Sequence, residues 1–171
     1  GREAVIYLGT SPGFRKVHAR NEAHDEILSI ALNVHDVPAF PGAWLDPRLL
    51  QIRTPVGIDG DSYSLRFENG GWVSGFGGTP NPVEVEALLD TLRTLHVEGV
   101  ASMDMHRELM DAEAALELRV RGLAGTVTLE LFAADDRYFV LSSEYPLFFR
   151  LSRYDFDRLT GIDFSRMSES G

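Results

Sequence analysis

Short runs of β-branched and aromatic residues recur along the chain, and in one of them hydrophobic and polar residues alternate, which is typical of a strand with one buried face. Tyr63, Leu65 and Phe67 alternate with polar residues, and Asn69-Gly70 follows them. Both central residues of a type I′ turn need positive φ, so Asn-Gly predicts a tight hairpin here. Similar apolar runs bounded by turn residues predict a series of strands, with Asp135-Asp136 in one of the later turns. The expected strands are residues 4–8, 15–20, 27–32, 52–58, 63–67, 72–73, 116–121, 126–132, 138–141 and 147–151.

One segment changes to helical periodicity, from Pro82 to Val97. Asn81 is suited to cap its first turn, Pro82 tolerates the first helical position, and Glu84 completes a capping-box-like arrangement. The apolar residues of this segment fall on one face of a helix. They are Val85, Leu88, Leu89, Leu92 and Leu95.

Shorter helices are expected at Trp44–Leu50, where Asp46 and Pro47 form a helix start, and at Tyr154–Thr160. Residues 101–115 are interpreted as a helical turn plus loop. The chain is therefore expected to have an α+β fold, made mainly of antiparallel hairpins in a meander. One amphipathic helix packs on a sheet face, and short helices close each repeat unit.

An internal repeat is indicated by a similar pattern of residues at the two ends of the chain. Val17–Ile30 aligns without gaps on Tyr138–Leu151, although no residue is identical. We interpret residues 1–51 as the C-terminal part of a first β-rich repeat unit and residues 52–165 as a complete second unit. Residues 166–171 form a tail. Repeated units normally bury their faces against neighbours.

Composition narrows the possible partners. The apolar fraction of 44% and charged fraction of 25% are those of a folded globular protein. The net charge is −10 and Lys16 is the one lysine, which argues against nucleic acid and against direct contact with an anionic membrane. The chain has no cysteine, so disulfides and cysteine-ligated metals are excluded. It also has no apolar run long enough to span a bilayer.

The order of several motifs resembles a bacterial family known as domain of unknown function 4340. The motifs are Trp44–Leu50, then Asn69–Trp72 in a hairpin, the helix with Leu92 and Leu95, and Tyr138–Val140 in a strand. The resemblance covers nearly the whole chain and implies context rather than chemistry. Members look like membrane-anchored proteins with a repeated domain outside the cytoplasm, some encoded beside ABC-type permeases. The family supplies no catalytic residues to carry over.

Several short motifs contain residues used in catalysis or metal binding, in the wrong setting. His24-Asp25 and His35-Asp36 fall in a turn and a proline-flanked loop, without further ligands at metal-binding spacing. Asp59-Gly60-Asp61 lacks the remaining ligands of a calcium loop. We interpret all three as polar turn residues.

Four other features are interpreted as structural or solvated and not as functional sites. The segment Gly71–Gly75 differs from the spacing of a nucleophile elbow, and the loop Gly75–Pro80 has no lysine for phosphates. His96 and His106 have no metal-binding partner at ligand spacing. The sequence therefore assigns no catalytic, cofactor-binding or metal-binding residue, and predicts no cofactor.

Aromatic residues are concentrated near the C-terminal end of the chain. Consecutive Phe148-Phe149 places one ring on each face of its strand, so both faces need cover. Three functions remain open. The first is a non-enzymatic interaction or scaffold domain, extracytoplasmic and possessing a protein partner such as an ABC-type transporter. The alternative is a ligand-binding domain with an aromatic-lined groove for lipid, glycan or peptide. A hydrolase with a dispersed site ranks third.

The N-terminal strand Ala4–Leu8 has no charge and no proline to discourage pairing. The chain begins at Gly1 without an initiator methionine, and we interpret it as a piece of a longer protein. An edge strand with unpaired N–H and C=O groups recruits another strand. We therefore expect this strand to pair inside the domain on one side and to mediate self-association on the other.

Overall fold

The structure is a computed structural model that describes residues 5–22, 26–33, 41–60, 63–75 and 79–162. The chain divides into two compact units, Gly1–Trp44 and Leu45–Gly171. The described residues contain eleven strands in antiparallel sheets and three α-helices. The predicted α+β class with antiparallel hairpins is confirmed. The division into repeat units after residue 51 stays a prediction.

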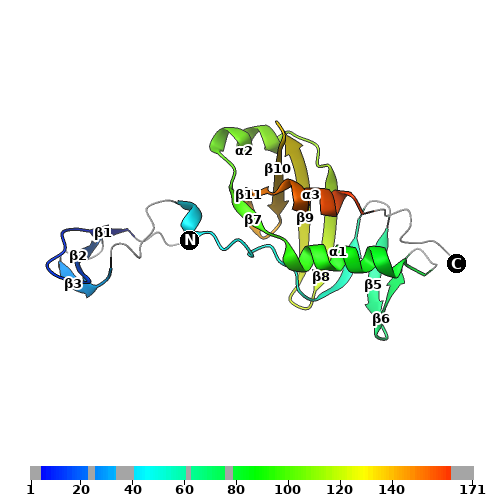
Figure 1. The fold of residues 1–171 in the computed structure, drawn as a ribbon, viewed down its shortest axis with the longest axis horizontal. Coiled ribbons are helices and arrows are strands. Elements are labelled where there is room, and N and C mark those ends of the chain that lie inside the picture. Colours follow the sequence, from blue (N-terminus) through cyan, green and yellow to red (C-terminus); the bar gives the residue numbers. More distant parts are fainter. Residues whose placement is uncertain (1–4, 23–25, 34–40, 61–62, 76–78, 163–171) are drawn as a thin grey trace. The chain divides into compact units, whose positions relative to one another are not determined.

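The first unit contains a three-stranded antiparallel sheet with the order β1-β2-β3 (Figure 1). β1 is Ile6–Leu8, β2 is Lys16–Asn21 and β3 is Leu28–Ala31. These strands correspond closely to the predicted ones, and Ala4 lies outside the described residues. On the central strand β2, Val17 and Ala19 are buried.

The second unit contains one eight-stranded antiparallel sheet with the order β6-β5-β4-β8-β9-β10-β11-β7. β8 pairs with β4, which joins the first meander of the unit to the later hairpins. The strands are β4 (Pro55–Asp59), β5 (Ser64–Glu68), β6 (Gly71–Ser74), β7 (Val97–Val100), β8 (Leu116–Gly122), β9 (Thr126–Ala134), β10 (Arg137–Ser142) and β11 (Tyr145–Leu151).

Two hairpin turns set the register of their strands. Asn69 and Gly70 have φ of 51° and 84° between β5 and β6, as a type I′ turn requires. Asp135 and Asp136 have φ of 50° and 56° between β9 and β10. Aspartate tolerates this left-handed region better than most side chains. Both turns were predicted, and both are confirmed.

Helix α1 (Pro82–Thr94) lies across one face of the eight-stranded sheet (Figure 1). The Oδ1 atom of Asn81 accepts a hydrogen bond from the Val83 N–H at 2.9 Å, so the predicted N-cap is confirmed. The predicted apolar face is also confirmed, because every residue of it is buried in the main core. These residues are Val85, Leu88, Leu89, Leu92 and Leu95.

The C-terminal end of this helix differs from the prediction. The helix ends at Thr94, and Val97–Val100 forms β7, which pairs with β11 at the edge of the sheet. Gly99 is therefore a strand residue and not a position beyond a helix. An added Cβ at Gly99 would lie 2.9 Å from the Arg150 guanidinium on the neighbouring strand. This close approach explains a glycine inside a strand.

The segment 101–115 contains a full helix, α2 (Met103–Met110), where only a helical turn was expected. Ser102 caps it, with its Oγ accepting from the Met105 N–H at 3.3 Å. Met105 and Leu109 pack on a second, smaller core formed by aromatic residues of the sheet. These aromatic residues are Phe132, Phe139 and Phe148.

Residues 41–50 do not form the predicted helix at Trp44–Leu50. Pro41–Trp44 is a 3-10 helix, and a turn follows in which the Leu49 N–H donates to the Asp46 carbonyl at 3.1 Å. Asp46 still acts as a cap. The backbone N–H of Arg48 donates to its carboxylate and holds the pKa of Asp46 below its ordinary value. The cap is present, but the chain leaves the helical path after one turn.

The predicted closing helix is confirmed as α3 (Arg153–Thr160). Ser152 caps it by accepting from the Asp155 N–H at 3.0 Å, and Phe156 and Leu159 are buried in the main core. Arg158 connects this helix to α1 through an ion pair with Asp90 at 2.6 Å. Among the described helices, none is long and apolar enough to cross a bilayer.

We predict that Leu92→Ala destabilises the second unit by about 2–5 kcal/mol, because Leu92 is fully buried between α1 and the sheet. Urea unfolding followed by circular dichroism measures the change. Val83→Ala on the exposed side of the same helix is the control, and it should change stability by less than about 0.5 kcal/mol. Equal effects of the two substitutions would contradict the assigned helix face.

Candidate functional site

Among the residues that first suggested chemistry, those that the structure describes do not come together. His24-Asp25, His35-Asp36 and Asp61 lie outside the described residues. Asp59 accepts a hydrogen bond from the Ser64 hydroxyl at 2.6 Å and forms an ion pair with Arg121 at 3.4 Å. Its carboxylate is therefore engaged within the sheet, as a structural residue would be.

His96, His106 and the serine of the elbow-like segment are also separate. His96 is exposed, directly after α1, and His106 stacks edge-on against Phe148 with ring centroids 5.1 Å apart. Ser74 ends the edge strand β6, opposite Leu65. Within the described residues, no group of three or more histidine and carboxylate side chains is placed to hold a metal ion.

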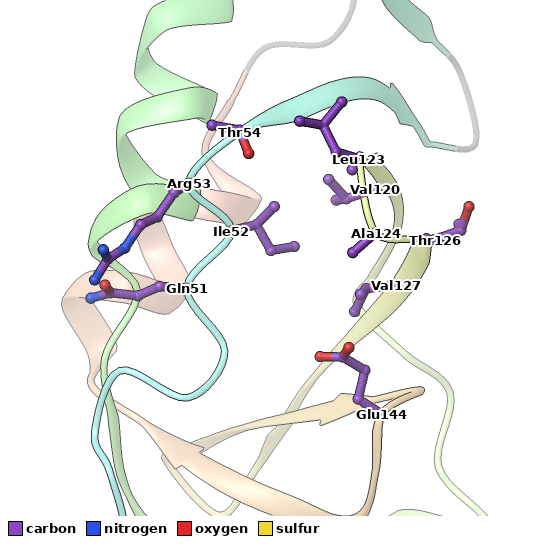
Figure 2. A pocket seen from close by; sticks show the side chains of 12 residues that line it. Gln51, Ile52, Arg53, Thr54, Val120, Leu123, Ala124, Thr126, Val127 and Glu144 are labelled. Atoms are coloured by element: carbon purple, nitrogen blue, oxygen red, sulfur yellow. The ribbon is translucent and has the colours of Figure 1, made fainter.

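Figure 2 shows a hollow of about 430 Å³ in the second unit, between the segment 51–54, the β8–β9 turn and Glu144. Its walls carry both polar and apolar side chains, and the Arg53 side chain extends away from the Glu144 carboxylate. The lining contains no histidine, cysteine, lysine or aromatic residue. The hollow is therefore not the aromatic-lined groove expected of a ligand-binding domain.

The aromatic residues of the C-terminal region instead form the two cores. Phe149 and Phe156 belong to the core beneath α1 and α3, whereas Phe148 belongs to the core beneath α2. The expectation that Phe148-Phe149 places a ring on each face is confirmed. Helices of the same unit cover both faces at this point, so these rings are not available to a ligand.

The feature that remains exposed is one face of the three-stranded sheet. Residues paired directly across antiparallel strands share a face, so the register of β1, β2 and β3 places one set of aliphatic side chains together. We call this set the apolar face. It consists of Ile6, Leu8, Val17, Ala19, Leu28 and Ile30.

The apolar face is buried at its centre and exposed along its sides. Val17 and Ala19 have 0% and 8% of their surface exposed, whereas Ile6 and Leu28 have 63% and 57%. A hollow of about 350 Å³ lies here, and Arg20 and Glu26 contribute to its lining. Large aliphatic side chains exposed side by side are typical of surfaces that contact a protein, a membrane or a ligand.

Strands β9, β10 and β11 of the eight-stranded sheet have the same pairing register as β1, β2 and β3. Val17 pairs with Ile30 and Tyr138 pairs with Leu151, as the aligned sequences require. One strand further, Leu8 pairs with Ala19 and Leu131 pairs with Val140. The apolar face therefore has a position-by-position counterpart. This counterpart consists of Leu129, Leu131, Tyr138, Val140, Phe149 and Leu151.

The two faces differ in their cover. Leu129 and Leu131 are fully buried in the main core under α1 and α3, but Ile6 and Leu8 at the equivalent positions are 63% and 43% exposed. Strand β8 pairs with the outer side of β9. Among the described residues, no strand pairs with the outer side of β1. We call this side of Ile6–Leu8 the open edge.

The hydrogen bonds of β1 show which of its groups face outward. The Val5 carbonyl accepts from the Glu22 N–H at 3.2 Å, and the Gly9 N–H donates to the His18 carbonyl at 2.8 Å. Inward and outward groups alternate along an antiparallel strand, so Ile6 and Leu8 direct their N–H and C=O groups to the open edge. An extended segment placed there would find both the hydrogen-bonding groups and the aliphatic side chains of a sheet neighbour.

Comparisons of the chain with protein-family models, with curated proteins and with solved structures find no match in any of the three. The resemblance to the domain of unknown function 4340 family therefore rests on the sequence motifs alone and stays a prediction.

We predict no stabilisation by divalent metals or nucleotides in a thermal-shift screen, because none of the described residues converge on such a ligand. A ligand at a hundred times its dissociation constant would add ~2.7 kcal/mol of stability, which the screen detects easily. A metal-dependent shift that His24→Ala or His35→Ala abolishes would contradict this prediction.

We predict weak self-association of the chain through the open edge, since two copies of β1 can pair antiparallel with Ile6 opposite Leu8. Ile6→Lys should abolish this association by placing a charge on the edge. Sedimentation velocity over a range of concentrations measures it, with Met110→Lys on the exposed side of α2 as the control. A chain that remains monomeric at high concentration would argue against self-pairing.

Proposed function

We propose that this chain is a non-enzymatic interaction or scaffold domain that binds a protein partner through the open edge and the apolar face. One observation carries the proposal. Positions that are buried in the second unit, Leu129 and Leu131, have exposed counterparts in the first unit, Ile6 and Leu8. Exposed aliphatic side chains beside unpaired strand groups are the features used in strand addition by a partner.

A repeated architecture is part of the same proposal. The first unit would be a partial copy of the second, in which β1, β2 and β3 take the places of β9, β10 and β11. The identical pairing register supports this interpretation, because a shift of one residue would place every side chain on the wrong face. Repeat units bury their apolar faces against adjacent units or partners, as the exposed face here requires.

We further propose that the chain is the extracytoplasmic part of a membrane-anchored bacterial protein, accessory to an ABC-type transporter. The resemblance described above supports this context. The net charge of −10 argues against contact with anionic lipid headgroups, so the partner would be a protein of the membrane complex and not the bilayer itself.

We predict that a photo-crosslinker placed at Ile6 in the intact parent protein captures a permease subunit of a membrane complex in living cells. The same crosslinker at Met110, which is 63% exposed on α2 in the second unit, is the control and should capture no permease. The products are identified by mass spectrometry. Equal capture from both positions, or capture of cytoplasmic proteins alone, would contradict the proposed function.

A further inference from the structure

The register shared by the two sheets also specifies the residues that a partner strand should carry. In the second unit β8 pairs antiparallel with β9, and Leu116, Glu117 and Leu118 lie opposite Leu131, Glu130 and Leu129. Leu131 and Leu129 are the counterparts of Leu8 and Ile6. A strand seated on β1 in the same way places aliphatic side chains opposite Leu8 and Ile6, on the apolar face. Its middle residue then lies opposite Tyr7.

In the second unit, β8 occupies the side of β9 that corresponds to the open edge of β1. The Leu131 carbonyl accepts from the N–H of Ala115, the residue immediately before β8, at 2.7 Å. At the equivalent position, the Leu8 carbonyl points to the open edge. The partner strand therefore finds the same arrangement of acceptors and donors on β1 as β8 finds on β9.

The middle residue meets a positive charge. Tyr7 pairs with Arg20, so both lie on the face opposite the apolar face, and the Arg20 guanidinium lies 5.2 Å from the Tyr7 ring centroid. Arg20 has no salt bridge with any residue that the structure describes. An acidic residue opposite Tyr7 would reach this guanidinium across the ring, and opposite charges on one sheet face stabilise strand pairing.

A second copy of the chain matches this position less well. Its β1 would place Tyr7 opposite Tyr7 and bring a second Arg20 to the same face. The two arginines beside the pair of tyrosines would repel each other. A carboxylate on a partner strand would instead neutralise the charge of Arg20. The next residue of a strand like β8 is also suited to the site. Arg119 of such a strand would lie opposite Val5, whose hydrogen-bonded partner is the exposed Glu22, directly after β2.

We infer that the open edge binds an antiparallel strand of a partner protein with the pattern aliphatic–acidic–aliphatic, read opposite Leu8, Tyr7 and Ile6. This inference rests on the proposed interaction function and adds the chemistry of the partner. It assigns Ile6 and Leu8 to the aliphatic contacts and Arg20 to recognition of the acidic residue.

The probe is a capped synthetic peptide with the sequence of residues 114–120, which contains the pattern as Leu116-Glu117-Leu118. Titration into the full chain, followed by amide NMR, should shift the signals of Ile6, Tyr7 and Leu8. The matched peptide with lysine in place of the glutamate should bind about fivefold more weakly, the size expected for one cross-strand charge pair. Ile6→Lys in the chain should remove detectable binding while the α1 signals remain unchanged.

A charge exchange tests the recognition of the acidic residue. Arg20→Glu should weaken binding of the glutamate peptide and strengthen binding of the lysine peptide, because the sign of the charge beside Tyr7 is reversed. This result cannot arise from misfolding, since one peptide gains affinity.

Three results would overturn the inference. The first is the absence of NMR shifts at Ile6–Leu8 at peptide concentrations of about 1 mM, which is the range of weak complexes. The second is a set of shifts confined to β6, β7 or β9. The third is equal binding of both peptides to both chains. If a permease is crosslinked in cells but one of these three results is obtained, the interaction function stands and only the strand motif is rejected. If the peptide binds as expected but no permease is crosslinked, the strand motif stands and the proposed interaction with a permease is rejected.

Discussion

The second unit depends on one constraint, the two-residue period of a sheet that has large apolar side chains on both faces. Phe148 and Phe149 are consecutive in β11 and are both buried, so each face must be covered. Helices α1 and α3 cover one face, and α2 covers the other. Full burial of a phenylalanine or leucine side chain stabilises a fold by about 1.5–3 kcal/mol, so the three helices are held in place by the sheet that they cover.

The first unit has the same register without the same cover. Its central residues Val17 and Ala19 are buried, but Ile6, Leu8 and Leu28 present aliphatic surface to solvent. The corresponding face of the second unit contacts two helices and a neighbouring strand. This difference is the physical reason to place the proposed function at the open edge. Exposed aliphatic side chains are unfavourable in water, and burial against a partner would remove this free-energy cost.

The elements that were predicted correctly are those fixed by local chemistry. Asn69-Gly70 and Asp135-Asp136 adopt positive φ, and Asn81 caps α1 through its own side chain. The hairpins and the buried face of α1 follow from short periodic patterns. The β1 strand and its exposure to pairing were also predicted from a run of residues without charge or proline.

The elements that were missed depend on contacts distant in sequence. Val97–Val100 becomes a strand because β11 pairs with it, and no local pattern separates it from a helix end. Trp44–Leu50 begins with a cap but stops after one turn. Its continuation is drawn against α1, where the Ile52 N–H donates to the Leu92 carbonyl at 3.0 Å. The candidate site shows the same division. The sequence indicates an edge strand, but the partner pattern requires the register of β8 on β9.

Amide hydrogen exchange of the isolated chain at low concentration tests the central claim most directly. Tyr7 directs its N–H to β2, whereas Ile6 and Leu8 direct theirs to the open edge. The account predicts slow exchange at Tyr7 and fast exchange at Ile6 and Leu8, with slow exchange at their counterparts Leu129 and Leu131. Equal protection at Ile6, Tyr7 and Leu8 would show that this edge is already paired, and would contradict its assignment as the interaction site.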